Sequence, residues 1–171
     1  MKIYAQHRRQ VMRMMGDNSI AVLPAAPVLL RNRDVEHGFR QDSDFYYLSG
    51  FPEPESVIVL VPGRKQGQFI LFVRDRDKKK ETWDGRRYGP EGAVEQFGAD
   101  QAYPITDLED ILPGLMEHCE SVYYTIGLNP EFDKHLMNCV NNLRSKVRGG
   151  THVPYEFVSL DYLLHDMRLY K

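Results

Sequence analysis

Two short apolar runs, separated by glycine and proline, form the strongest pattern in the chain. The runs are residues 56–61 (SVIVLV) and 68–73 (QFILFV), and a Pro-Gly pair and a further glycine lie between them. Apolar residues occupy consecutive positions in both runs, which is typical of strands buried on both faces. We therefore predict an antiparallel hairpin inside a sheet that helices cover on both sides.

Helical spacing of apolar residues is clearest at residues 130–147, where Phe132, Leu136, Val140 and Leu143 recur on one side. Alternation of such segments with apolar runs predicts an α/β fold, with a mixed β-sheet flanked by helices on both faces. The segment 45–48 (FYYL) indicates a strand or tight turn because aromatic residues favour strands. The charge run at residues 74–81 indicates a solvated face or loop. Further helices are predicted at 4–15, 90–97, 107–118 and 159–170, and strands at 19–24, 121–126 and near 157.

Length and charge narrow the class of protein. The 171 residues suit one domain. A formal net charge of −2 argues against a generic nucleic-acid binder, which is normally basic. No apolar run approaches the roughly 20 residues of a membrane helix, and no apolar stretch follows the N-terminal basic residues as in a signal peptide. The two cysteines, Cys119 and Cys139, suit reduced thiols in a cytoplasmic protein.

The residue patterns contain no self-contained catalytic constellation. The six histidines show neither HxH nor HExxH spacing, and nucleophile-elbow, P-loop and dinucleotide motifs are missing from the sequence. Asp75 and Asp77 form a DxD, but it lies in the charge run and indicates solvated charge. Cys139 falls on an apolar helical stripe and is predicted to be core. These patterns alone indicate a soluble cytosolic α/β domain.

One segment is more specific. Residues 40–55, RQDSDFYYLSGFPEPE, combine polar turn residues, aromatics, a glycine and two prolines, which suits a scaffold corner before a core strand. With the strand that follows, this segment resembles the N-terminal domain of aminopeptidase P, the Xaa-Pro aminopeptidase of the creatinase/prolidase group. Three other stretches agree in order and spacing. They are RRQ at 8–10, ETWDGRR at 81–87 and HDMRLYK at 165–171.

The resemblance implies a fold and a division of labour. Residues 1–171 would form a single creatinase/prolidase N-terminal domain with a ribonuclease H-like motif, preceding a pita-bread catalytic domain that this chain lacks. That catalytic domain carries two metal ions, usually Mn²⁺, and hydrolyses the bond preceding proline. None of its two Asp, one His and two Glu ligands lies in this chain, so the isolated chain is expected to be inactive, with no catalytic, metal or cofactor residue of its own.

The implied role is indirect, and Trp83 is its main residue. In the family, the matching tryptophan reaches a neighbouring subunit and walls its substrate pocket, so the domain supports oligomerisation and shapes the active site. A buried structural tryptophan is the alternative. Arg86 and Arg87 would either pair with a carboxylate across the interface or remain solvated. Expected partners are the catalytic domain, other subunits of a homo-oligomer and proline-containing peptides, with no nucleic acid or membrane.

Two further residues match family positions at the domain junction. Asp34 and Arg168 would make hydrogen-bonded contacts with the catalytic domain, where an Arg–carboxylate pair fixes orientation. Without that domain, both are expected to be solvated. Tyr46 and Tyr47 are predicted to be core residues.

A second reading comes from a different class of protein. Pita-bread relatives that have lost catalysis bind peptides or proteins, and the chain could belong to such a binding module. The ETWDGRR run favours the enzyme, because a non-catalytic relative has less reason to keep a tryptophan that walls a substrate pocket. An autonomous hydrolase is disfavoured because the sequence shows no paired constellation of catalytic residues.

Overall fold

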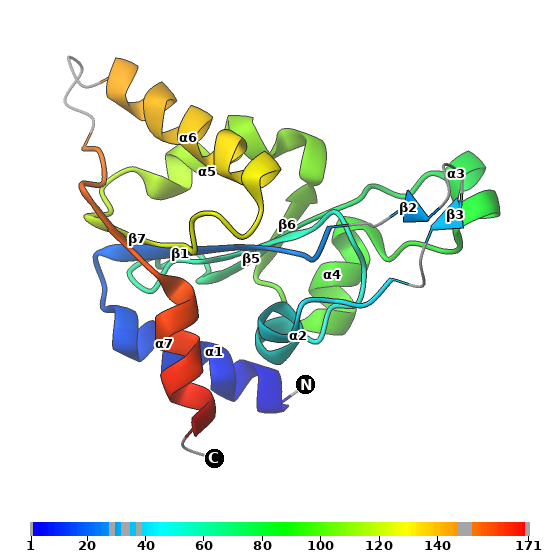
Figure 1. The fold of residues 1–171 in the computed structure, drawn as a ribbon, viewed down its shortest axis with the longest axis horizontal. Helices are drawn as coiled ribbons and strands as arrows, with labels where there is room; N and C mark the ends of the chain where they lie inside the picture. Colours follow the sequence, from blue (N-terminus) through cyan, green and yellow to red (C-terminus); the bar gives the residue numbers. More distant parts are fainter. Residues whose placement is uncertain (1, 28–29, 32–34, 37–38, 147–151, 170–171) are drawn as a thin grey trace.

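The computed structural model describes residues 2–27, 30–31, 35–36, 39–146 and 152–169. Its centre is a mixed sheet of six strands in the order β6-β5-β4-β1-β7-β8 (Figure 1). β4 pairs antiparallel with both of its neighbours, β1 and β5, whereas the other pairs in this sheet are parallel. The strands are β1 (Ser19–Pro24), β4 (Val57–Leu60), β5 (Phe69–Val73), β6 (Gln101–Pro104), β7 (Ser121–Tyr123) and β8 (Glu156–Val158).

Helices cover both faces of this sheet, as the doubly apolar strands predict (Figure 1). α5 (Leu108–Met116) and α6 (Pro130–Ser145) pack on one face. On the other face lie α1 (Lys2–Met15), α2 (Ser43–Ser49), α4 (Gly89–Phe97) and α7 (Leu160–Leu169). To one side of the sheet lie β2 (Leu30–Arg31), β3 (Val35–Glu36) and α3 (Lys78–Asp84). The short 3₁₀ helix η1 (Ile105–Asp107) precedes α5.

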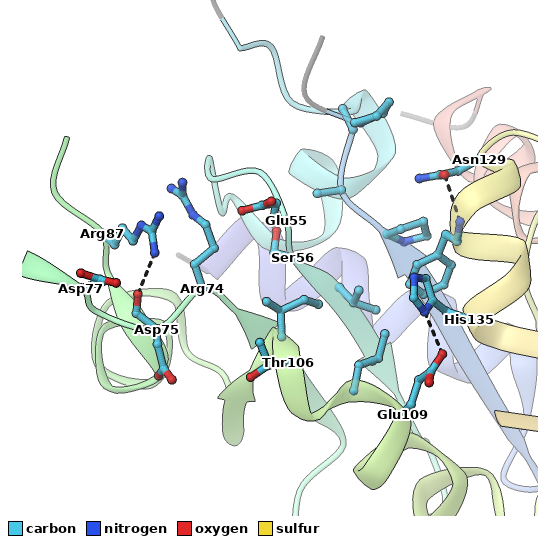
Figure 2. Close-up of a pocket in the computed structure, with 18 of the residues that line it drawn as sticks. Glu55, Ser56, Arg74, Asp75, Asp77, Arg87, Thr106, Glu109, Asn129 and His135 are labelled. Carbon is cyan, nitrogen blue, oxygen red and sulfur yellow. Dashed lines mark hydrogen bonds and ion pairs between the residues drawn. The ribbon is translucent and has the colours of Figure 1, made fainter. Parts of the chain in front are cut away.

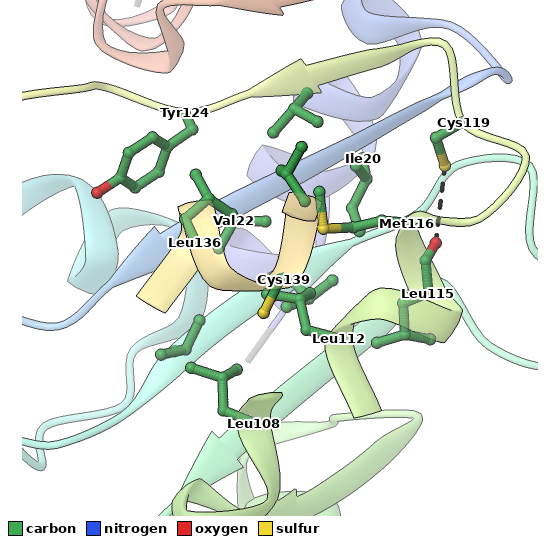
Figure 3. Packing of buried hydrophobic residues seen from close by; sticks show 14 of the residues in the cluster. Ile20, Val22, Leu108, Leu112, Leu115, Met116, Cys119, Tyr124, Leu136 and Cys139 are labelled. Carbon is green, nitrogen blue, oxygen red and sulfur yellow. Dashed lines mark hydrogen bonds between the residues drawn. The ribbon is translucent and has the colours of Figure 1, made fainter. Parts of the chain in front are cut away.

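Successive residues of β4 divide between two apolar cores. Val57 and Val59 point to the α5/α6 side, and Ile58 and Leu60 point to the α1/α7 side. Figure 3 shows the first core, where Leu112 of α5 packs beside Cys139 of α6 and the strands below. Full burial of each such aliphatic side chain contributes about 1.5–3 kcal/mol, so the hairpin stabilises both layers.

Residues 45–48 are helical, and the predicted strand or tight turn is wrong. They lie in α2, where the Asp42 side chain accepts a hydrogen bond from the Phe45 amide (2.9 Å) and caps the helix. Gly50 ends the helix in the left-handed conformation, at φ 68°. Phe45 and Leu48 are fully buried, at the i, i+3 spacing of a helix face. Caps and burial on one face therefore outweigh the strand preference of the aromatic residues.

Both cysteines are buried, which confirms the core prediction for Cys139. Burial raises the pKa of Cys119 to about 11 and that of Cys139 to about 12. Both groups are therefore thiols at neutral pH and poor nucleophiles, because the thiolate is the reactive form. Among the helices of the described segments, none is long and apolar enough to cross a membrane.

Arg8, from the RRQ stretch, is buried on the α1 side. It donates a hydrogen bond to the Leu48 carbonyl (2.9 Å), and its guanidinium lies 3.9 Å from the centre of the Phe69 ring. Burial lowers its pKa to about 10, so it remains charged at neutral pH. Arg8 thus ties α1 to α2 and to the hairpin.

Candidate functional site

Residues 74–88 form a polar segment that we call the charged lobe. It contains α3, so the C-terminal end of the run at 74–81 is the solvated face of a helix rather than a loop. The Asp77 side chain caps α3 by accepting from the amides of Lys79 (3.0 Å) and Lys80 (3.2 Å). None of the α3 residues is buried, so polar contacts rather than an apolar face hold this helix in place.

Glu81 is the centre of these contacts, with a side chain only 8% exposed. Its Oε1 accepts from Nε of Arg76 (2.9 Å) and from the Arg87 amide (2.7 Å), and its Oε2 accepts from the Asp77 amide (3.1 Å). The hydrogen bond from the Arg87 amide and the nearby Arg76 charge lower the pKa of Glu81 below its ordinary value. One carboxylate therefore ties both ends of α3 together.

Glu53 joins the lobe to the body of the domain. This buried residue lies in the turn after α2, where its Oε2 accepts from the Tyr88 amide (2.8 Å) and its Oε1 pairs with Arg74 (3.3 Å). The Glu53 and Arg74 side chains are only 9% and 14% exposed. A buried pair of this kind fixes geometry, because loss of either partner leaves an uncompensated charge.

Trp83 projects from α3 with 88% of its surface exposed, so the alternative of a buried structural tryptophan is wrong. Arg86 is exposed as well. Arg87 is buried, donates to the Asp75 carbonyl (3.2 Å) and lies 3.7 Å from an Asp84 oxygen. The solvated alternative therefore does not hold for Arg87, whose contacts are internal to the lobe. The interface roles of Trp83, Arg86 and Arg87 stay predictions.

The expectation that Arg168 is solvated is wrong. Its Nη2 forms an ion pair with Oδ1 of Asp44 at 2.5 Å, which links α7 to α2. Burial raises the pKa of Asp44, and the Arg168 charge partly offsets this effect. Arg168 found a partner inside the chain because the two helices pack on the same face of the sheet. Its predicted role at a domain interface stays a prediction, and Asp34 lies outside the described residues.

The two tyrosines of α2 differ from each other. Tyr47 is partly buried and stacks on His7, with ring centres 3.6 Å apart. Tyr46 is 46% exposed, so the core prediction is wrong for this residue. It meets Tyr4 edge-on at 5.8 Å. Adjacent helical residues point in different directions, so they cannot both face the core as two residues of one helix stripe.

Glu53 and Glu81 are not among the site residues predicted from the sequence. Glu81 follows the capping Asp77 by four residues and reaches back to its amide, much as the glutamate of a capping box does three residues after the cap. That spacing was a usable signal. The sequence carries no comparable local signal for Glu53, since its partners Arg74 and Tyr88 lie 21 and 35 residues away.

The described residues do not form a metal centre. Within them, no group of three or more His, Cys, Asp or Glu side chains could hold a metal ion. The resemblance places the metal ligands in a catalytic domain outside this chain.

Protonation of Glu81 should loosen the charged lobe. Because the folded-state pKa lies below the ordinary 4.5, the contribution of Glu81 to stability is present above that value and is lost as pH falls through the lowered pKa. Trp83 is the only tryptophan, so its fluorescence anisotropy reports on the lobe. We expect anisotropy to drop as pH falls below the ordinary glutamate value, before global unfolding seen by circular dichroism.

The Glu81→Gln variant, which mimics the protonated form, should show lower anisotropy already at neutral pH. Glu91→Gln is the matched control, because Glu91 is an exposed glutamate in the neighbouring helix α4. Equal anisotropy for Glu81→Gln and wild type at neutral pH would contradict the role of this carboxylate.

Together, the fold and the charged lobe define a class: an α/β domain with a mixed sheet that presents an exposed tryptophan on a polar-braced helix. Residues 4–124 match the family described as the aminopeptidase P N-terminal domain. The chain belongs to this family.

Comparisons with individual proteins support the same family. The chain is 34% identical over 168 residues to the Xaa-Pro aminopeptidase of Escherichia coli, covering 97% of this chain and 38% of the relative. It is 31% identical to human Xaa-Pro aminopeptidase 3, covering 85% of this chain and 32% of the relative. Among solved structures, Pseudomonas aeruginosa aminopeptidase PepP superposes with a TM-score of 0.95 at 59% identity, covering 98% of this chain and 38% of that one. The chain thus spans less than two fifths of the length of these relatives.

Proposed function

We propose that this chain serves as the non-catalytic N-terminal domain of a Xaa-Pro aminopeptidase, which releases the residue that precedes proline. In this role the domain supports assembly of a homo-oligomer and walls the active site of a neighbouring subunit through Trp83. The observation that carries the proposal is the 88% exposure of Trp83 on a helix held by Glu81 and Asp77. A large, rigid ring presented in this way suits contact with a short peptide.

The polar contacts of the charged lobe support a role of the Trp83 ring in binding a partner. α3 buries none of its residues, so the exposed tryptophan does not contribute to a core. The contacts of Glu81 and Glu53 instead hold the lobe in one orientation before a partner arrives. Pre-organisation of this kind lowers the entropy cost of binding. Arg86, exposed beside Trp83, is available to pair with a carboxylate of the partner subunit.

The reaction itself would be carried out by the remaining region of the full-length protein. A solved relative is described as zinc-substituted Escherichia coli aminopeptidase P in complex with product. We propose that the full-length protein is likewise a metalloenzyme, with two Mn²⁺ ions held by residues outside this chain. The partners would then be the catalytic domain, sister subunits and proline-containing peptides. The expected cytoplasmic location stays a prediction.

A paired hydrolysis assay tests the proposal. The 171-residue chain and the gene product extended beyond Lys171 are incubated with an Xaa-Pro peptide, with Mn²⁺ or with a chelator. We expect activity in the extended protein only, and its loss with the chelator. Activity of the 171-residue chain would contradict the non-catalytic assignment. Inactivity of both proteins would favour the second reading, a peptide- or protein-binding module.

A further inference from the structure

A cavity of about 840 Å³, whose lining does not include Trp83, opens at one end of the central strands (Figure 2). β1, β5 and β6 have their carboxyl ends at this cavity, and residues at the start of α5 and α6 form another part of its wall. In α/β proteins, ligands commonly bind in the crevice outside the carboxyl ends of the strands. This position gives a general reason to ask what the cavity could hold.

Its cationic side contains two guanidinium groups that are nearly removed from solvent. The Arg87 side chain is 9% exposed and that of Arg74 is 14% exposed. In both residues, Nε is buried and has no hydrogen-bond partner among the described residues. The shared neighbour Glu53 holds them close together, because it pairs with Arg74 and accepts the amide of Tyr88, which follows Arg87.

The partners within the lobe leave donors unused. Arg87 reaches Asp84 only at 3.7 Å, which is longer than a hydrogen bond, and Arg74 contacts a single oxygen of Glu53. Both arginines line the cavity, so an anion there can accept from their Nη atoms, whereas the fully buried Nε atoms are out of its reach. The planar fork of arginine matches the two oxygens of a carboxylate or phosphate.

The net charge of the cavity wall indicates whether a carboxylate or a phosphate fits better. Four cationic side chains line it, and four carboxylates line it as well, so the wall carries no large positive excess. A monoanion is therefore favoured over a phosphate dianion or a polyanion such as nucleic acid. The cationic side chains are Arg74, Arg76, Lys80 and Arg87, and the carboxylates are Glu55, Asp75, Asp77 and Glu109.

The remaining wall is mostly apolar. Pro24, Ile105 and Phe132 are among the lining residues, and Figure 2 shows His135 on the side of the cavity opposite the two arginines. A cavity of this volume is larger than a small ion needs and accepts an organic body. We propose that it binds an organic monocarboxylate with an apolar body, whose carboxylate is held by Arg74 and Arg87. This proposal does not depend on the role of Trp83 or on aminopeptidase activity.

Titration calorimetry on the 171-residue chain tests it with four probes. They are N-acetyl-alanyl-leucine, its C-terminal amide, 4-methylpentanoate and inorganic phosphate. We expect at least one of the two carboxylates to bind saturably, the amide to bind at least about tenfold more weakly than the acid of the same peptide, and phosphate to bind more weakly than the carboxylate. The tighter of the two carboxylates identifies the source as a peptide C-terminus or a free acid.

Three variants connect this binding to the cavity. Arg74→Met and Arg87→Met should each weaken the carboxylate about tenfold or more. Because either change could disturb the lobe, Thr106→Trp adds a bulky ring at an exposed position that lines the cavity, and it should also weaken binding. Arg13→Met, an exposed arginine of α1, is the control and should bind as wild type does.

Three results would overturn the proposal. These are equal affinity for the peptide acid and its amide, tighter binding of phosphate than of either carboxylate, and no saturable binding of either carboxylate. Undiminished binding by a folded Thr106→Trp variant would overturn it as well.

Discussion

Replacing Glu53 with alanine is expected to lower the free energy of unfolding by about 3–5 kcal/mol, the usual cost of breaking a buried ion pair from one side. The change leaves the Arg74 guanidinium, 14% exposed, without its carboxylate, and it removes the acceptor of the Tyr88 amide. The lobe also loses its link to the turn after α2. Urea denaturation followed by circular dichroism measures the effect.

Glu55→Ala provides the matched control, because Glu55 lies two residues away in the same turn and is exposed. It should change stability by no more than about 0.5 kcal/mol. The double variant Glu53→Ala/Arg74→Met should be less destabilised than the sum of the two single changes, since the unpaired charge is gone. Similar stabilities for Glu53→Ala and Glu55→Ala would contradict the bracing role of this pair.

Replacing Trp83 with alanine is expected to lower kcat/KM of the extended protein for an Xaa-Pro peptide about 30-fold, or about 2 kcal/mol, as for a tryptophan at the centre of a contact. The loss should fall mainly on KM, because a pocket wall contributes to binding more than to bond cleavage. Stability should change little, since the ring is 88% exposed. Steady-state kinetics and thermal unfolding of the same samples separate the two effects.

Tyr162→Ala is the control for this variant, because Tyr162 is also a large exposed aromatic residue, at 70%, but lies on α7. A role across subunits makes a further prediction. Mixed oligomers of Trp83→Ala subunits with subunits inactivated in the catalytic region should regain activity, because intact rings then face intact sites. Unchanged KM in Trp83→Ala, or no recovery in mixed oligomers, would contradict the proposed wall in trans.

Much of the fold could be predicted because its signals are local. Consecutive apolar residues at 56–61 and 68–73 produced a hairpin with both faces covered, as expected. α6 begins at Pro130, and the Asn129 side chain caps it by accepting from the Phe132 amide (3.1 Å). Both features depend on residues within a few positions of one another, and the sequence displays them directly.

The segment at 45–48 shows where local signals failed. The aromatic residues at 45–48 favour strands in isolation, but caps at Asp42 and Gly50 and burial against α1 made them a helix. Propensity is a weak prior that tertiary context overrides. The charge run at 74–81 contained a helix start at Asp77, with Glu81 tied back to it.

In the candidate site, too, some features follow from the sequence and others only from the structure. Trp83, Arg86 and Arg87 were found from a short motif, and the structure then separated an exposed ring from a buried arginine. By itself, the sequence determined the strands and the main helices, because periodicity and caps act over a few residues, and the family resemblance singled out the segment that carries the tryptophan. Only the tertiary structure decided which charges meet. The pairs Glu53–Arg74 and Asp44–Arg168 join segments far apart in the chain, and their contacts depend on how the layers pack.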